Sequence, residues 1–249
     1  MNGSLRVLYV AGLPHSGSTL LTRVLGEIDG LFAAGEVYSL GERVANADRC
    51  GCGLALGDCA FRAIAAESGC RVIVDSSKSP TYAHILDGVT GIELCGVHLV
   101  RDPRPTSYSW SVDPHYHRTR GLAFGARWTL WNLELEAFAA RRRTAFVRLR
   151  FEDFLRDPVA ETRRVAGLVG AREAALPFVD GTAVRLPSHH MIEGHASRFD
   201  TGVVGIRANT AWQRRLSTRR ELSTVLLALP LQLLYGYPPA RRLARAASR

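Results

Sequence analysis

The chain has 249 residues, 47% of them hydrophobic, and a formal net charge of +9. This length allows one sizeable hydrophobic core, and the composition excludes a largely disordered or low-complexity chain. The apolar stretch 226–234 contains Pro230 and is too short to cross a bilayer, and no secretory signal pattern precedes the first predicted strand. We therefore expect a single domain over residues 1–249, in the cytoplasm and without stable membrane association.

Short apolar runs bounded by polar turns alternate with segments of helical spacing through the first 170 residues. The runs that predict buried strands are 5–11, 31–34, 71–75, 93–100 and 145–150. The segments that predict helices are 18–28, 82–86, 105–111, 123–143 and 159–169. This alternation predicts an α/β fold in three layers, with a central, mainly parallel sheet flanked by helices.

Two later segments lack this regular pattern. Residues 187–209 have little periodicity and much glycine, histidine and arginine, so they predict a long loop folded over the sheet edge, above the ligand site. Residues 238–249 begin with two prolines and contain several arginines. They predict a basic C-terminal tail.

Five cysteines, an odd number, argue against a disulfide framework and indicate a reducing compartment. Cys50, Cys52 and Cys59 are close together and could offer three thiolates to zinc. Their spacing lacks the C-x-x-C pair of common structural zinc sites, and no fourth ligand is evident. We expect a structural loop here, with zinc binding as the alternative.

The segment 12–19, GLPHSGST, follows the first predicted strand and leads into the first predicted helix. Gly12 and Gly17 can adopt backbone angles closed to other residues, which leaves successive N–H groups and a helix N-terminus directed at an anion. The spacing is that of a Walker A loop, G-x-x-x-x-G-K-[ST], but Ser18 stands in the place of the lysine. Because that lysine binds the outer phosphates of ATP or GTP, the loop predicts a different anion.

Lys78 is the only lysine in a chain that has 32 lysines and arginines together. It lies in the segment 75–80, DSSKSP, at the exit of a predicted strand, where open α/β sheets bind their ligands. A compact ammonium group with three donors suits a ligand site where a planar guanidinium does not. Alternatively, Lys78 is a residue of a solvated loop that has been retained by chance.

A second anion site is predicted at the end of the strand 93–100. Arg101 leaves this strand, and Ser109 follows eight residues later on the next predicted helix. A guanidinium and a hydroxyl so placed can converge on one phosphate. Arg101 could instead form an ion pair with Asp102 or Asp157.

Residues 14–21, PHSGSTLL, together with residues 99–109, LVRDPRPTSYS, resemble the two cofactor motifs of sulfotransferases that use 3′-phosphoadenosine-5′-phosphosulfate (PAPS). The segments 75–80, 151–158 and 195–212 resemble bacterial members of this superfamily in the same order. The resemblance therefore spans nearly the whole chain. It implies a fold similar to P-loop NTPases, with PAPS as sulfuryl donor and no metal.

The resemblance also assigns residues to the two ends of the donor. It implies that the first loop binds the 5′-phosphosulfate, and the residues of this loop are Pro14, His15, Ser16, Gly17, Ser18 and Thr19. Arg101 and Ser109 are implied to bind the 3′-phosphate. The C-terminal cofactor motif of animal relatives is only loosely matched here, and we select Arg198 for its role, with Arg207 second.

Three residues are candidates for catalysis. Glu36 follows the strand 31–34 and resembles the catalytic glutamate of protein-tyrosine and heparan-type sulfotransferases, which implies that it accepts the proton of the acceptor hydroxyl. Alternatively, Glu36 stabilises the following helix through its dipole. Lys78 would neutralise the leaving phosphate. His15 stands where the family usually has lysine or arginine, and it could assist if an anionic neighbour favours its charged form.

We therefore expect an enzyme, a PAPS-dependent sulfotransferase that transfers a sulfuryl group to a hydroxyl of a small-molecule acceptor, such as a natural product, a phenol or a sugar. One alternative is a nucleotide-dependent kinase with an altered P-loop, against which the missing Walker lysine argues. Another is a basic protein that binds nucleic acid or an anionic surface, supported by charge alone. We expect no nucleic-acid partner. The loop 113–117 and His195 are weaker candidates for an acceptor pocket or a metal site.

Overall fold

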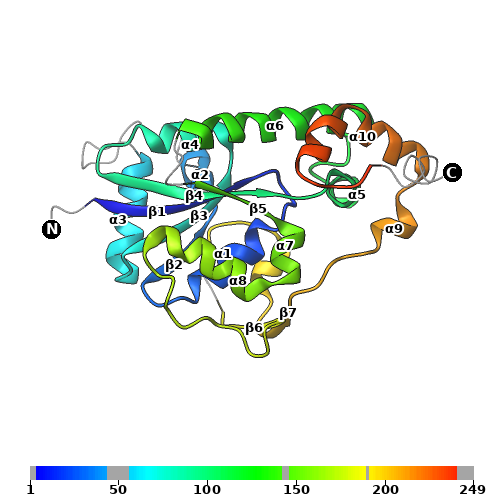
Figure 1. The fold of residues 1–249 in the computed structure, drawn as a ribbon. Helices are drawn as coiled ribbons and strands as arrows, with labels where there is room; N and C mark the ends of the chain where they lie inside the picture. Colours follow the sequence, from blue (N-terminus) through cyan, green and yellow to red (C-terminus); the bar gives the residue numbers. More distant parts are fainter. Residues whose placement is uncertain (1–3, 44–55, 142–145, 189–190, 240–249) are drawn as a thin grey trace.

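The structure is a computed structural model that describes residues 4–43, 56–141, 146–188 and 191–239. Its centre is a five-stranded parallel sheet with the strand order β2-β3-β1-β4-β5. These strands are β1 (Leu5–Gly12), β2 (Leu31–Gly35), β3 (Val72–Lys78), β4 (Ile92–Val100) and β5 (Phe146–Arg150). Figure 1 shows the sheet between helices above and below it. The predicted three-layer α/β fold is thus confirmed.

Helices connect the strands of this sheet and follow its last strand. They are α1 (Ser18–Gly26), α2 (Tyr38–Arg43), α3 (Leu56–Ser68), α4 (Pro80–Asp87), α5 (Pro103–Val112), α6 (Gly121–Arg141), α7 (Phe151–Arg156), α8 (Pro158–Ala166), α9 (Trp212–Arg215) and α10 (Thr218–Leu234). The predicted helix 159–169 divides into α8 and the short 3₁₀ helix η1 (Gly167–Val169). The predicted strand 71–75 is longer than expected, because β3 continues to Lys78.

Both faces of the sheet are buried. Leu8 and Val10 of β1 pack in one core with α1, α7 and α8. Val7 and Tyr9 belong to a second core with α3, α4 and α6 on the opposite face. Because successive side chains of a strand point to opposite faces, burial on both sides requires the continuous apolar runs seen in the sequence.

The start of a helix after a strand is specified locally at two points of the sheet edge. Asp102 follows β4, and its side chain accepts a hydrogen bond from the N–H of Arg104, while Pro103 opens α5. Ser79 and Pro80 act in the same way between β3 and α4. These caps turn the chain sharply at the carboxyl ends of the strands. The residues that follow the strands are thereby held at one edge of the sheet.

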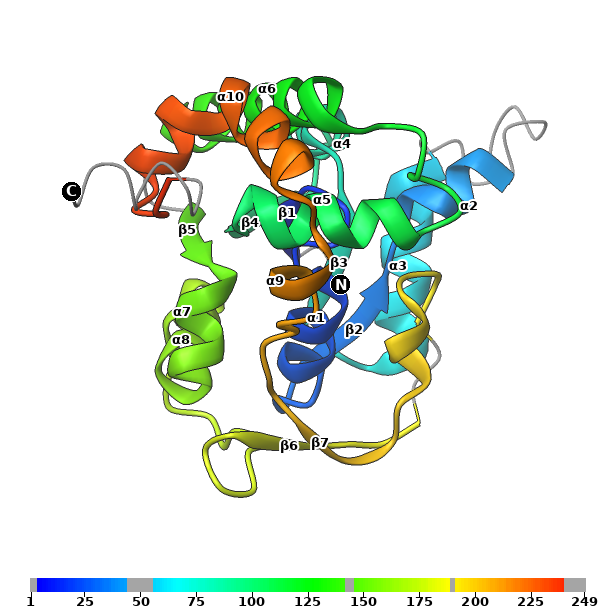
Figure 2. The same ribbon diagram turned by 90° about the vertical axis from the view of Figure 1, so that its right-hand side faces the viewer.

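The predicted loop 187–209 has more structure than its sequence indicates. It contains the 3₁₀ helix η2 (Ala196–Phe199) and the strand β7 (Gly202–Gly205), which pairs antiparallel with β6 (Ala183–Leu186). Residues 191–209, which we call the crossing segment, form a bridge from Ile192 to Gly35 at the end of β2. Figure 2 shows the chain passing from β7 across the front of the molecule to α9. It thus lies over the sheet edge.

The cysteines differ from expectation in one respect. Cys59 in α3 is disulfide-bonded, whereas Cys70 and Cys95 are not. Cys50 and Cys52 lie outside the described residues, and with them most of the predicted cysteine loop. In the described part of the chain, no three metal-ligating side chains gather into a possible metal site. Across the same part, every helix is too short or too polar to span a membrane.

Candidate active site

A pocket of about 600 Å³ lies at the carboxyl ends of β1, β3 and β4, under the crossing segment. The first loop, the start of α1, the end of α5 and the crossing segment contribute to its walls. From the first loop, the residues that line the pocket are Pro14, His15, Gly17, Ser18 and Thr19. From the rest of the chain, the predicted residues that line it are Glu36, Lys78, Arg101, Ser109 and Arg207. One cavity thus receives residues from both predicted anion sites.

The first loop has the strained backbone of an anion cradle. Gly17 has φ +101°, and a Cβ there would lie 2.2 Å from the ring of Phe151, so this position requires glycine. His15 also has a positive φ, of 69°, which is uncommon for a residue with a side chain. Ser16, in contrast, is not among the residues that line the pocket: it is 1% exposed, and its N–H donates to the carbonyl of Leu13 at 3.0 Å.

The start of α1 lies at the pocket without a side-chain cap. Its N-cap is Gly17, which has no side chain to accept hydrogen bonds from the first N–H groups. Its first turn carries no acidic residue. The amides of Ser18 and Thr19 therefore combine with the positive end of the helix dipole to favour an anion. The Thr19 hydroxyl accepts a hydrogen bond from the N–H of His195 at 3.3 Å, which fastens the crossing segment here.

Arg101 is fixed at the other end of the pocket. Its Nη1 donates to the carbonyl of His15 at 2.9 Å, and its guanidinium lies 5.1 Å from the ring centre of Phe151. Burial lowers the pKa of Arg101 below its usual value, although Glu152 opposes this effect. Ser109 shares the pocket, and its hydroxyl donates to the carbonyl of Pro105 at 3.1 Å.

The alternative partners proposed for Arg101 are engaged elsewhere. Asp102 forms an ion pair with Arg104 at 2.5 Å, and Asp157 caps α8 by accepting from the N–H of Ala160 at 2.9 Å. Arg101 therefore faces the pocket as a cation with N–H groups beyond the one that binds the His15 carbonyl.

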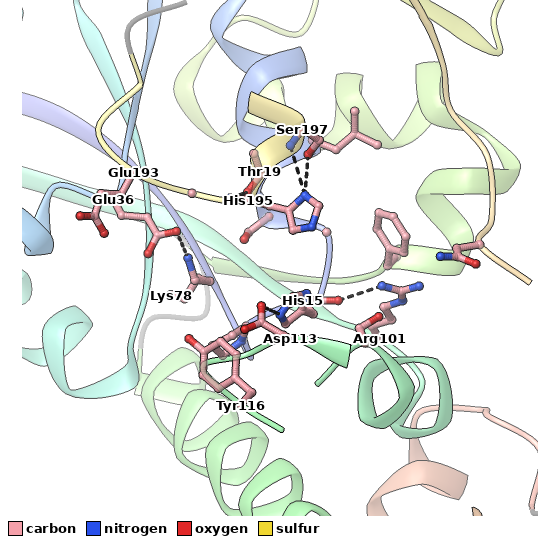
Figure 3. Close-up of a pocket in the computed structure, with 18 of the residues that line it drawn as sticks. His15, Thr19, Glu36, Lys78, Arg101, Asp113, Tyr116, Glu193, His195 and Ser197 are labelled. Atoms are coloured by element: carbon pink, nitrogen blue, oxygen red, sulfur yellow. Dashed lines mark hydrogen bonds and ion pairs between the residues drawn. The ribbon is translucent and has the colours of Figure 1, made fainter. Parts of the chain in front are cut away.

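Glu36 and Lys78 meet at the opposite end of the pocket, where the Lys78 ammonium forms an ion pair with the Glu36 carboxylate (Figure 3). Lys78 is only 9% exposed and has φ +67°, so it is not a solvated loop residue. Its Nζ also donates to the carbonyl of Ser76 at 3.2 Å. The N–H of Glu36 donates to the carbonyl of Ile192 at 2.6 Å, so the crossing segment positions the glutamate.

A buried carboxylic acid lies on β3 three residues before Lys78. Asp75 is fully buried, and burial raises its pKa to about 7, although hydrogen bonds from Ser77 oppose the rise. Its Oδ1 accepts from the N–H of Ser77 at 2.7 Å and from the Ser77 hydroxyl at 2.5 Å. Its Oδ2 finds no hydrogen-bond partner among the described residues. Asp75 thus titrates near neutral pH beside the candidate catalytic pair.

Arg198 and Arg207 differ in their positions. Arg207, the second choice from the sequence, lines the pocket. Arg198 instead donates to the carbonyl of Gly194 and packs against Phe199, with its guanidinium 4.5 Å from the ring centre. The geometry therefore favours Arg207 as the additional cation.

Several lining residues were only weak candidates in the sequence or were not selected from it. The loop after α5 brings Asp113 and Tyr116 into the pocket, and the crossing segment brings Glu193, His195 and Asn209. His15 Nε2 is 2.9 Å from Oδ2 of Asp113 (Figure 3). The adjacent histidines and aspartate of 113–117 were the only signal in the sequence, and their spacing does not reveal that they meet the first loop.

Comparisons with known proteins bear on the fold. The chain matches no family model and no curated protein. A sulfotransferase domain from the olefin synthase of Synechococcus PCC 7002 is 18% identical over 91% of this chain and 94% of its own, with a TM-score of 0.55. A sulfotransferase domain from the curacin biosynthetic pathway is 13% identical over 95% and 99%, with a TM-score of 0.57. The chain has the fold of these sulfotransferase domains.

Proposed function

We propose that this protein is a PAPS-dependent sulfotransferase that transfers a sulfuryl group to a hydroxyl of a small-molecule acceptor. The observation that carries the proposal is the convergence in one pocket of three features: the amides of the first loop, the cation Arg101 beside Ser109, and the Glu36–Lys78 pair. The two sulfotransferase domains that share the fold support it.

The residues present fit a donor with two anionic ends. The cradle at Gly17 has no room for a Cβ, and the uncapped start of α1 favours a phosphosulfate group. Arg101 and Ser109 suit the 3′-phosphate, because a guanidinium forms a charge-assisted fork and the hydroxyl can reorient from its carbonyl partner. Arg207 adds positive charge to the same pocket. When bound, PAPS supplies the sulfuryl group and a bisphosphate leaving group.

The chain's own residues accept the proton and stabilise the negative charge that the transfer generates. Glu36 receives the proton that the acceptor hydroxyl loses, and Lys78, in contact with Glu36, neutralises negative charge that develops on the leaving phosphate. The crossing segment covers the site through its bonds to Glu36 and Thr19. Covering the site restricts water and holds the reactants in line.

The acceptor class is part of the proposal. The two similar domains belong to an olefin synthase and to the curacin biosynthetic pathway, which favours a natural-product alcohol over a phenol or a sugar. A cytoplasmic location and the absence of a nucleic-acid partner also belong to the proposal.

Titration with the product 3′-phosphoadenosine-5′-phosphate (PAP) tests the donor. We expect saturable binding by calorimetry, followed by transfer of label from ³⁵S-PAPS to one member of an acceptor panel of alcohols, phenols and sugars. Magnesium-dependent ATP consumption without PAP binding would indicate the kinase alternative. Salt-sensitive binding to random DNA without PAP affinity would indicate a basic binding protein.

A further inference from the structure

His15 and Asp113 form a histidine–carboxylate pair inside the pocket. Nε2 of His15 is 2.9 Å from Oδ2 of Asp113, and the two side chains are only 14% and 20% exposed. The pair joins the first loop to the segment after α5, across 98 residues of sequence. His15 holds this position despite its left-handed backbone, and the Arg101 guanidinium binds its carbonyl oxygen. The imidazole is therefore fixed on both its ring and its main chain.

The charged and titratable groups around this imidazole come from three places. Asp113 follows α5, and Tyr116, from the same loop, has its ring centre 5.6 Å from that of His15. His195 of the crossing segment lies 5.8 Å away, ring centre to ring centre, and Arg101 follows β4. Asp113 is the anionic member of this set, while His195 and Arg101 disfavour a second positive charge.

We propose that His15 and Asp113 together form a proton-dependent cation site, in which binding of the bisphosphate nucleotide draws one proton onto His15. The proposal rests on the proposed function and deepens it. His15 occupies the place of a permanent cation in the resembling family, and Ser18 occupies that of the Walker lysine. The loop thus has a positive charge only when His15 is protonated.

The surroundings of His15 determine whether nucleotide binding takes up or releases a proton. In the free protein, burial lowers the pKa of His15 below 6.5, and this outweighs the opposing effect of Asp113. The ring is therefore neutral at pH 7.5. A phosphate group bound at the loop brings negative charge close to the ring and raises its pKa. Between the two pKa values, binding must take up a proton.

Asp113 makes this uptake possible as a positioning residue. The carboxylate accepts the Nε2 proton of His15, which orients the ring and leaves Nδ1 to receive the additional proton. Its negative charge also stabilises the resulting imidazolium, which Arg101 and His195 destabilise. Burial tends to raise the pKa of Asp113, but hydrogen bonds from the N–H of His115 and from His15 lower it below its usual value. Asp113 is therefore an anion throughout the neutral range.

Calorimetry of the full chain with PAP at pH 7.5 tests the proposal. Titrations in HEPES and in Tris, which have different heats of ionisation, give the number of protons taken up per PAP. The phosphates of PAP are about 3% protonated at this pH, so their own contribution is small. For the wild type we expect uptake of about half a proton or more, and a PAP Kd that rises up to tenfold per pH unit between pH 7 and 8.

Variants locate the proton. His15→Asn keeps a side chain that tolerates a positive φ but cannot titrate, and it should reduce the uptake to nearly zero with a flat pH profile. Asp113→Asn keeps the hydrogen-bond acceptor without its charge, and it should reduce the uptake to less than half of the wild-type value. His84→Gln, at an exposed position on α4 against Phe138, is the matched control and should leave the uptake unchanged.

Three outcomes would overturn the assignment. Equal binding heats in both buffers for the wild type would show that no proton is taken up. Uptake that survives in His15→Asn but disappears in His195→Asn would place the proton on the crossing segment. Uptake unaffected by Asp113→Asn would remove the positioning role. In each case PAP still binds, whereas failure of the proposed function would appear as no PAP binding at all.

Discussion

Replacing Arg101 by alanine should weaken PAP binding at least tenfold. Arg101 already gives one N–H to the carbonyl of His15, and its remaining donors face the pocket. A hydrogen bond to a charged group contributes about 1.5–3 kcal/mol. Since 1.4 kcal/mol corresponds to a factor of ten in Kd, loss of a single bond to the 3′-phosphate predicts a roughly 10- to 150-fold rise.

The same substitution also affects stability, which must be measured separately. Alanine loses the bond to His15 and the contact with the Phe151 ring, and the latter contributes about 0.5–2 kcal/mol. We expect the free energy of unfolding to fall by about 1–3 kcal/mol in urea denaturation, with the protein still folded at 25 °C. Arg101→Lys keeps the charge but loses the planar fork, so its affinity should be intermediate.

Isothermal titration calorimetry with PAP is the assay, and circular dichroism confirms that each variant is folded. Arg156→Ala is the matched control: Arg156 is exposed on α7 and pairs with Asp153, so its loss should leave PAP affinity unchanged. An Arg101→Ala protein that is folded and binds PAP with wild-type affinity would refute the placement of the 3′-phosphate at Arg101.

Three further predictions follow from the geometry. Glu36→Gln and Lys78→Ala should each lower turnover of labelled PAPS by about 100-fold or more while changing PAP affinity far less, and full activity in both would disprove their catalytic roles. Gly35→Ala should lower the urea midpoint of unfolding more than Gly30→Ala does. Both glycines have φ near +80°, but only at position 35 would a Cβ lie 2.5 Å from a carbonyl oxygen of the crossing segment. Equal decreases in the midpoint for the two variants would contradict this. The contribution of Asp75 to the free energy of unfolding should decrease as pH rises from about 4 to about 7, because burial raises its pKa in the folded state to about 7 and the folded state therefore holds the proton more tightly. Asp75→Asn should flatten the dependence of the free energy of unfolding on pH across that range, and an unchanged dependence would argue against this titration.

Most of the fold could be predicted because its signals are local. Each strand of the parallel sheet is a short apolar run, and each of the predicted helices has apolar residues at helical spacing. The strands β6 and β7 were missed because four residues are too few to show alternation, and each forms by pairing with the other. Helix α7 was not predicted because its six residues directly follow a strand.

The candidate site was predictable to the extent that it follows strand ends. The first loop and Arg101 come at the ends of buried strands, Lys78 is the last residue of another, and the carboxyl ends of parallel strands meet at one edge. The order of Arg198 and Arg207 was not predictable, because both belong to the crossing segment. That segment has no repeating pattern to show which side chains face inward.

The sequence by itself determined the α/β fold class, the phosphate-type loop and the approximate positions of the five strands of the parallel sheet, because backbone preference and burial act over neighbouring residues. Only the tertiary structure decided which charges meet: Lys78 with Glu36, and His15 with Asp113. These contacts depend on the strand order β2-β3-β1-β4 and on the crossing segment, which bring together residues that are distant in the chain. No local pattern encodes such a meeting, because it forms only when the sheet has assembled and the segment has closed over it.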